Sequence, residues 1–155
     1  MSEQHYLTQE GKQELERELQ KLIKKDRIEL AAKLKEAVSQ GDLKENADYH
    51  DAKEKQALME GRIHYLENVL RSATIIENNR ASDEIVLGST VTIREKGLDE
   101  DEQYMIVGAA EANPREGKIS NESPIGEALL GHKVGDNVRV KTPAGEVVFK
   151  IRKIT

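Results

Sequence analysis

The sequence has no cysteine and no tryptophan, and it has one phenylalanine among its 155 residues. The lack of cysteine excludes disulfide scaffolds, thiolate metal sites and cysteine nucleophiles. Aromatic residues make up 3% of the chain, so its cores must be aliphatic. No apolar run approaches the ~20 residues needed to span a membrane, and no signal-peptide pattern opens the chain. These absences predict a soluble, cytoplasmic protein that does not associate with membranes.

An excess of basic residues is also lacking. The net charge is −5, and residues 1–76 hold 13 Lys and Arg against 15 Asp and Glu, while residues 77–155 hold 11 against 14. Proteins that bind duplex DNA on their own normally present a basic face. Autonomous sequence-specific DNA binding is therefore not expected.

The common catalytic motifs are absent as well. The four histidines show no HExxH spacing, and there is no GxSxG, P-loop or dinucleotide-binding fingerprint. These absences favour a protein that is not itself an enzyme and acts through a partner.

The first half of the chain carries apolar residues at the three-to-four spacing of paired helices. Thr8 is the expected N-cap of a helix over about Gln9–Gln40, and a second helix is expected from Asp42 to about Ala73. The turn after Gly41 makes the two helices antiparallel, and an arm of ~30 residues reaches about 45 Å. The apolar stripe shifts near Asp26, which predicts a small slip of the seam. The stripe residues are Leu15, Leu19, Leu22, Ile23, Leu30, Leu34 and Ala37 upstream, and Met59, Ile63, Leu66 and Leu70 downstream.

The second half has the alternation of a small antiparallel sheet with one short helix. Strands are expected around residues 90–94, 104–107, 118–120, 138–141 and 147–154, with an acidic loop over 98–102 and a helix that starts at Pro124. The predicted fold class is α+β with two domains. The predicted boundaries are a hairpin with an acidic tip over 1–76, a linker over 77–83 and a sheet domain over 84–155.

The hairpin tip contains the acids that most need an explanation. Asp42 and Glu45 have the spacing of a capping box, which is one explanation, and helix-dipole stabilisation and tip solubility are others. Asp42, Glu45 and Tyr49 also have the spacing of one helix face. Because Mg²⁺ is commonly held by one or two carboxylates, with waters and a partner's ligands completing its shell, the tip is also a candidate half-site.

Several motifs in order resemble the GreA/GreB family of bacterial transcript cleavage factors, and the resemblance covers nearly the whole chain. The tip, residues 41–50, reads Gly-Asp-Leu-Lys-Glu-Asn-Ala-Asp-Tyr-His and is similar to the family's tip signature. Residues 7–11, 60–63, 123–131 and 142–146 resemble further family motifs.

This resemblance implies a hairpin that enters the secondary channel of bacterial RNA polymerase and stimulates the polymerase's own Mg-dependent cleavage of backtracked RNA. Asp42 and Glu45 would act there on a Mg²⁺ shared with the polymerase, with no cofactor bound by the chain alone. Asn46, Tyr49, Lys53 and Lys35 would lie near the nascent RNA 3′ end. An FKBP-like C-terminal domain would dock on the polymerase through Ser123, Pro124, Gly126, Leu129 and Gly131. Family members often carry Arg where this chain has Val38, which weakens the expected grip on RNA.

Two other functions remain open from the residues. One is an inhibitor that blocks the secondary channel on the same scaffold, although the intact Asp42 and Glu45 pair argues against it. The other is a folding helper with an FKBP-like domain on a helical arm. The scarcity of aromatic residues in the second half argues against a working isomerase pocket.

Overall fold

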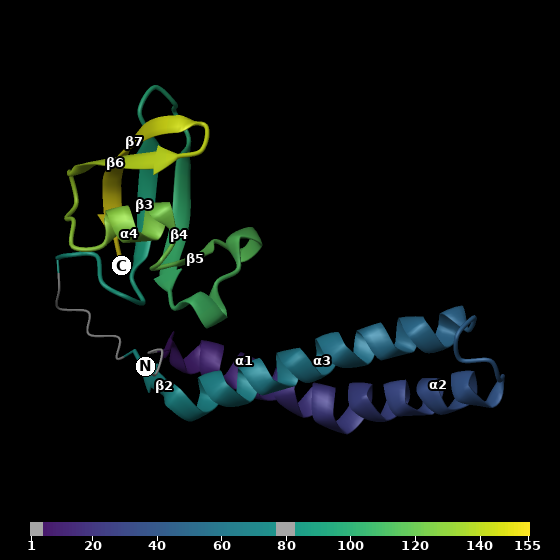
Figure 1. Cartoon of the computed structure of the whole chain (residues 1–155). Helices are drawn as coiled ribbons and strands as arrows, with labels where there is room; N and C mark the ends of the chain where they lie inside the picture. Colours follow the sequence, from purple (N-terminus) through teal and green to yellow (C-terminus); the bar gives the residue numbers. More distant parts are fainter. Residues whose placement is uncertain (1–4, 77–82) are drawn as a thin grey trace. The chain divides into compact units, whose positions relative to one another are not determined.

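The computed structural model describes residues 5–76 and 83–155 of the chain. By their internal contacts these residues divide into two units: Lys12–Ser72 forms one, and the described parts of Met1–Gly11 and Ala73–Thr155 form the other. The predicted class, α+β with a helical hairpin and a sheet that carries a short helix, is confirmed (Figure 1). Apart from Asp83, the predicted linker lies outside the described residues, and the predicted domain boundaries stay a prediction.

The hairpin consists of one long composite helix and a second helix antiparallel to it (Figure 1). The first contains α1 (Gln9–Lys21), the π-helical segment η1 (Leu22–Asp26) and α2 (Arg27–Ser39); the second is α3 (Ala47–Ser72). The N-cap of α1 is confirmed, since Gly11 N–H donates to Thr8 Oγ1 at 3.0 Å.

The predicted slip of the apolar stripe coincides with the π-helical segment. A π turn inserts an extra residue into a helix and rotates the side chains that follow it. The stripe therefore returns to the seam beyond η1, where Ala37 is buried, as Leu15 is before it. On α3, Ile63 and Leu66 are buried as expected, and Val69 is buried beside them.

Two bidentate ion pairs join the two antiparallel helices of the hairpin. Arg27 Nε and Nη2 donate to Glu60 at 2.9 and 2.8 Å, and Arg62 Nε and Nη2 donate to Glu18 at 2.7 and 2.9 Å. These hydrogen bonds raise the pKa of both guanidinium groups, and the bond from Arg27 lowers the pKa of Glu60. Because the four side chains are partly exposed, the pairs contribute little to the free energy of folding and serve mainly to fix the register of the two helices.

The second unit is built on a five-stranded sheet of order β5-β4-β3-β7-β6. All of its neighbouring strands pair antiparallel except β4 and β5, which are parallel, so the purely antiparallel expectation was wrong at this edge. The acidic loop is shorter than predicted, because Asp101 and Glu102 already belong to β4. The bounds are β3 (Thr90–Glu95), β4 (Asp101–Val107), β5 (Lys118–Ser120), β6 (Asn137–Thr142) and β7 (Gly145–Ile154).

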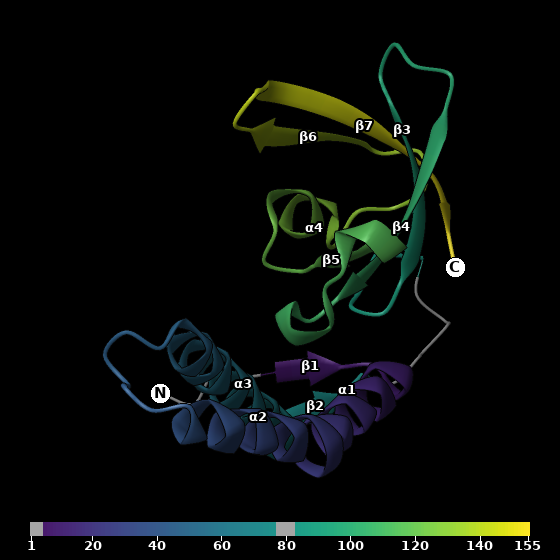
Figure 2. The same ribbon diagram turned by 90° about the vertical axis from the view of Figure 1, so that its right-hand side faces the viewer.

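One face of this sheet covers the core and curls around α4 (Pro124–Leu129), as Figure 2 shows. Ile93, Ile106, Leu129 and Ile151 are completely buried in a mainly aliphatic cluster that also contains Phe149. The alternate residues of β3, β6 and β7 point to the opposite face, which is polar.

The structure has a short two-stranded parallel sheet that the sequence did not indicate, with one strand before the helical unit in the chain and one after it. β1 (His5–Leu7) pairs with β2 (Ala73–Ile75), so residues from both ends of the hairpin belong to the second unit. Two 3₁₀ helices, η2 (Ala109–Glu111) and η3 (Pro114–Glu116), complete that unit. Glu111 of η2 accepts hydrogen bonds from Thr8 N at 3.0 Å and Thr8 Oγ1 at 2.5 Å.

Candidate functional site at the hairpin tip

The tip is a tight, left-handed turn between α2 and α3. Gly41 has φ +80°, and Asp42 is the one described residue other than glycine with a positive φ, at +33°. Asp is one of the few side chains that tolerate this conformation. The Glu45 N–H donates to the Asp42 carbonyl at 3.3 Å and closes the turn that follows.

Asn46 organises this turn, and the predicted capping box of Asp42 and Glu45 is wrong. Helix α3 begins at Ala47, and Asn46 Oδ1 accepts from Tyr49 N–H at 3.0 Å. An N-cap residue needs an extended backbone, which the positive φ of Asp42 excludes. The sequence predicts Asp42 alone as the cap of this helix, and the left-handed turn moves the cap to Asn46.

Asn46 also connects the two helices. Its Nδ2 donates to the Ala37 carbonyl at 2.7 Å and to the Gly41 carbonyl at 3.3 Å. One side chain thus caps the start of α3 and satisfies carbonyls at the end of α2. The half-buried position of Asn46 therefore has a structural cause, and its predicted contact with RNA stays a prediction.

Asp42 and Glu45 are left exposed by this arrangement. Neither carboxylate makes a hydrogen bond or ion pair in the part of the chain that the structure describes. The idea that Asp42, Glu45 and Tyr49 share one helix face is also wrong, because the two acids precede α3. Capping no longer accounts for either acid.

Tyr49 and His50 brace the base of the tip. Tyr49 is half-buried, and its ring meets the His50 ring edge-on at 5.6 Å between centroids. His50 Nε2 lies 3.3 Å from the Lys44 carbonyl oxygen, and this contact links the tip turn to the first turn of α3. The chain thereby holds the acids on a defined loop.

The two lysines predicted to lie near the RNA end differ in their contacts. Lys35 is exposed and has no polar partner among the described residues, while Lys53 Nζ donates weakly to Gln56 Oε1 at 3.4 Å. Val38 is 47% exposed. An exposed apolar residue therefore stands on α2 just before the tip, where a longer basic side chain would meet solvent.

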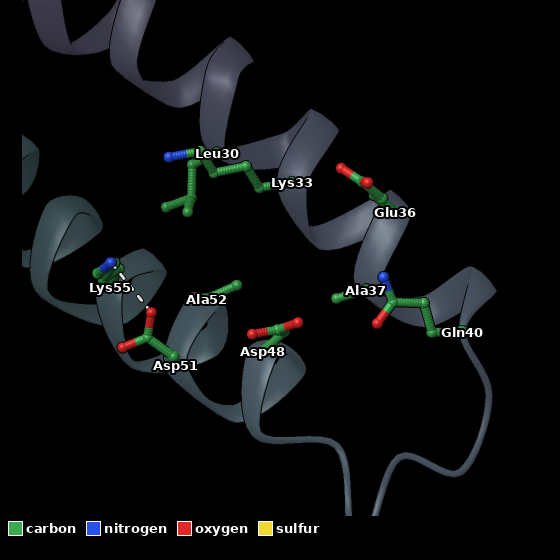
Figure 3. A pocket seen from close by; sticks show the side chains of 9 residues that line it. All are labelled: Leu30, Lys33, Glu36, Ala37, Gln40, Asp48, Asp51, Ala52 and Lys55. Atoms are coloured by element: carbon green, nitrogen blue, oxygen red, sulfur yellow. Dashed lines mark ion pairs between the residues drawn. The ribbon is translucent and has the colours of Figure 1, made fainter.

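A groove of 240 Å³ lies between α2 and α3 behind the tip. In Figure 3, Ala37 and Ala52 face each other across it, and their small side chains leave the space between the helices. Its walls carry Lys33 and Lys55 and a larger number of acids and amides, and Lys55 is already paired with Asp51 at 3.0 Å. With two cations against three acids, this groove has no marked excess of either charge.

The tip acids supply oxygen ligands for a metal ion but do not form a complete metal site by themselves. In the described part of the chain, no three His, Asp or Glu side chains gather closely enough to hold a metal ion. Two unengaged carboxylates supply hard oxygen ligands of the kind Mg²⁺ takes, but its six-coordinate shell needs donors from elsewhere. The tip therefore suits a metal shared with another molecule.

The residues predicted to dock on the polymerase all lie at or after the start of α4, where each has a structural role. Ser123 Oγ accepts from Gly126 N–H at 3.1 Å and N-caps α4. Gly126 packs against the Ser120 carbonyl too closely for any Cβ, and Leu129 is completely buried. Gly131 has φ +83° after the helix. Of this set, Pro124 and Gly131 are exposed and Ser123 is half-buried, and the docking role stays a prediction.

Comparison with known proteins matches both halves of the chain. Residues 5–75 match the family model "Transcription elongation factor, N-terminal", and residues 80–155 match "Transcription elongation factor, GreA/GreB, C-term". The chain is thus a transcription elongation factor built from a helical hairpin and a curled sheet domain.

Curated relatives agree over nearly the full length. Transcription elongation factor GreA of Bacillus velezensis is 52% identical over 96% of this chain and 95% of its own length, and GreA of Bacillus subtilis (strain 168) has the same values. A solved structure of GreA factor homolog 1 (Gfh1) of Thermus thermophilus is 33% identical, with 99% of each chain covered and a TM-score of 0.46. The chain belongs to the GreA/GreB family of transcription elongation factors. No helix in the described residues is long and apolar enough to cross a membrane.

Proposed function

We propose that this chain binds bacterial RNA polymerase, places the hairpin tip in the secondary channel and stimulates the polymerase's own cleavage of backtracked RNA. The observation that carries this proposal is the pair of exposed carboxylates, Asp42 and Glu45, on a turn held by Asn46 and without partners in the described chain. Membership of the family supports it.

The chain's own contribution is position and charge. The helical arm carries the tip, and the ion pairs Arg27–Glu60 and Arg62–Glu18 hold its two helices in register. Asn46 fixes the turn that carries Asp42 and Glu45, two exposed anionic oxygen donors. A Mg²⁺ shared with the polymerase would activate water toward a phosphodiester. Tyr49, at the base of the tip, would then lie beside the RNA end.

The test uses a stalled polymerase complex with end-labelled, backtracked RNA. We expect the wild-type chain to release short 3′ fragments, and Asp42→Asn and Glu45→Gln each to lower the cleavage rate by orders of magnitude, because a neutral amide oxygen is a poorer Mg²⁺ ligand than a carboxylate. Neither acid caps a helix, so thermal melts should be unchanged. Added Mg²⁺ should recover part of the loss by mass action.

Glu54→Gln is the matched control, since it removes an exposed acid from α3 outside the tip turn. It should cleave like the wild type. Normal cleavage by both tip variants would exclude a metal role for the acids. Polymerase binding with slowed elongation and no cleavage would instead identify a channel-blocking inhibitor.

A further inference from the structure

The outer face of the five-stranded sheet carries a basic groove that the tip chemistry does not use. It has a volume of 360 Å³ and is formed by the end of β3, the turn after it, β6 and β7. Its lining contains four cations and one acid, Glu95, within a chain of net charge −5. The cations are Arg94, Lys96, Arg139 and Lys150.

Strand register places these charges side by side. Arg94 of β3 lies directly opposite Lys150 of β7, and Arg139 of β6 lies opposite Val148, whose carbonyl accepts from Lys96 N–H at 2.9 Å. Like charges directly opposite each other destabilise a pair of strands. An anionic partner that pairs with Lys150 would therefore stabilise this arrangement.

Among the residues that the structure describes, the two arginines of the groove form ion pairs and the two lysines do not. Arg94 Nε lies 2.7 Å from Asp101 Oδ1, and Arg139 Nε lies 3.7 Å from Glu146 Oε1. The ammonium groups of Lys96 and Lys150 are exposed and have no hydrogen bond or ion pair within the described residues. The groove therefore offers two unengaged cations to a ligand.

Apolar surface lies among these charges. Leu98 is 52% exposed at the rim, and Val148 lies half-buried in the floor. The lining has no aromatic residue on which a nucleic-acid base could stack. Two free ammonium groups beside an aliphatic surface suit a short protein segment better than a nucleic-acid backbone, which is engaged through many phosphate contacts.

We infer that this groove binds an acidic segment of a protein partner. Two carboxylates of the segment pair with Lys96 and Lys150, and an apolar side chain between them contacts Leu98 and Val148. The inference rests on the sheet face alone and does not depend on the tip acids or on RNA cleavage.

The test measures fluorescence anisotropy of a labelled peptide of Asp and Glu residues interrupted by one Leu, titrated with the full chain. We expect saturable binding that weakens with added salt. The double variant Lys96→Glu, Lys150→Glu should weaken binding at least about tenfold, because like charges then face each other. Leu98→Ser should weaken it by a smaller factor.

The matched control is Arg115→Glu with Lys133→Glu, which changes the net charge equally at exposed positions outside the groove. It should keep wild-type affinity. A second double variant, Lys96→Gln with Lys150→Gln, avoids new repulsion and should also lose affinity, with circular dichroism as the folding check.

Three results would overturn the inference. They are equal loss of affinity in the groove and control variants, no saturable binding of the peptide by the wild-type chain, and groove-dependent binding of duplex DNA in preference to the peptide. The last would assign the face to nucleic acid.

Discussion

The carboxylate of Glu111 and the carboxylates at the hairpin tip lie in opposite environments. Glu111 is 8% exposed and accepts two hydrogen bonds from Thr8, whereas Asp42 and Glu45 are exposed and accept none from any described side chain. A buried carboxylate is tolerated only when hydrogen bonds replace its water. The contrast separates an acid that holds the fold from two acids that the described part of the fold leaves unengaged.

The approach of Glu111 to the start of α1 depends on a glycine. A Cβ on Gly11 would overlap the Glu111 carboxylate, which Thr8 already holds in place. Gly11 is therefore required by the contact, although its helix would otherwise favour alanine. The tip has no comparable crowding, since a Cβ at Gly41 would meet no atom.

The largest expected change in stability comes from Gly11→Ala. We expect it to displace Glu111 from Thr8 and to lower the free energy of unfolding by about 1–3 kcal/mol, the cost of leaving buried polar groups unsatisfied. In a Glu111→Ala background the sign should reverse, because the alanine then adds only its helix propensity. Denaturant unfolding of the four proteins of this cycle measures the coupling. Equal effects of Gly11→Ala in both backgrounds would show that the contact does not constrain residue 11.

The next largest change in stability is expected at Asn46, which caps α3 and also holds the turn that carries the tip acids. Asn46→Ala removes the cap of α3 and should cost about 0.5–2 kcal/mol. Asn46→Asp keeps an N-cap but loses the donor to the Ala37 carbonyl, so it should retain most of the stability while the tip turn loosens. Thermal melts and RNA cleavage rates, measured together, test this separation. Wild-type cleavage by both variants would mean that the turn needs no clamp.

A stabilising change of up to about 1 kcal/mol is expected for Gly61→Ala. Gly61 lies within α3, is exposed, and a Cβ there would meet no atom within 4 Å. Unlike Gly11, it protects no close contact. Chemical denaturation compares the variant with the wild type, and a loss of stability would reveal a packing role for this position that the fold does not display.

The smallest effect is expected at Asp136 and concerns pH. A hydrogen bond from Lys133 N–H, at 2.9 Å, and one with His132 lower the pKa of Asp136 below its ordinary value of 3.8. The stabilisation is therefore present above pH 3.8 and is lost as pH falls through the folded pKa. NMR titration should place this pKa below 3.8, and the stability difference from Asp136→Asn should shrink in acid. A pKa at or above 3.8 would contradict the assignment.

Local sequence was a good guide where one short-range rule dominates. The shift of the apolar stripe near Asp26 appears as the π-helical segment, Thr8 caps α1, and alternation located the strands of the sheet. The acidic tip was evident from its composition and its place between two apolar repeats. In each case neighbours in the chain are also neighbours in space, so the pattern carries the answer.

Local sequence failed where two solutions satisfied the same rule or where the partners are distant. Both Asp42 and Asn46 can cap a helix, and the left-handed turn together with the reach of Asn46 to Ala37 decided between them. The pairing of β1 with β2 joins residues that precede the helical hairpin to residues that follow it. A strand of three residues is also too short to show a clear alternation of apolar and polar residues.

The amino-acid sequence by itself determined the helical arm, the alternating strands and the presence of acids at the tip, because spacing and residue type set these locally. The tertiary structure decided which of the acids are satisfied. It buried Glu111 against Thr8, left Asp42 and Glu45 without partners among residues 5–76 and 83–155, and set Arg94 beside Lys150 across two strands. Hydrogen-bond satisfaction and cross-strand register depend on groups far apart in the chain, so only the folded arrangement settles them.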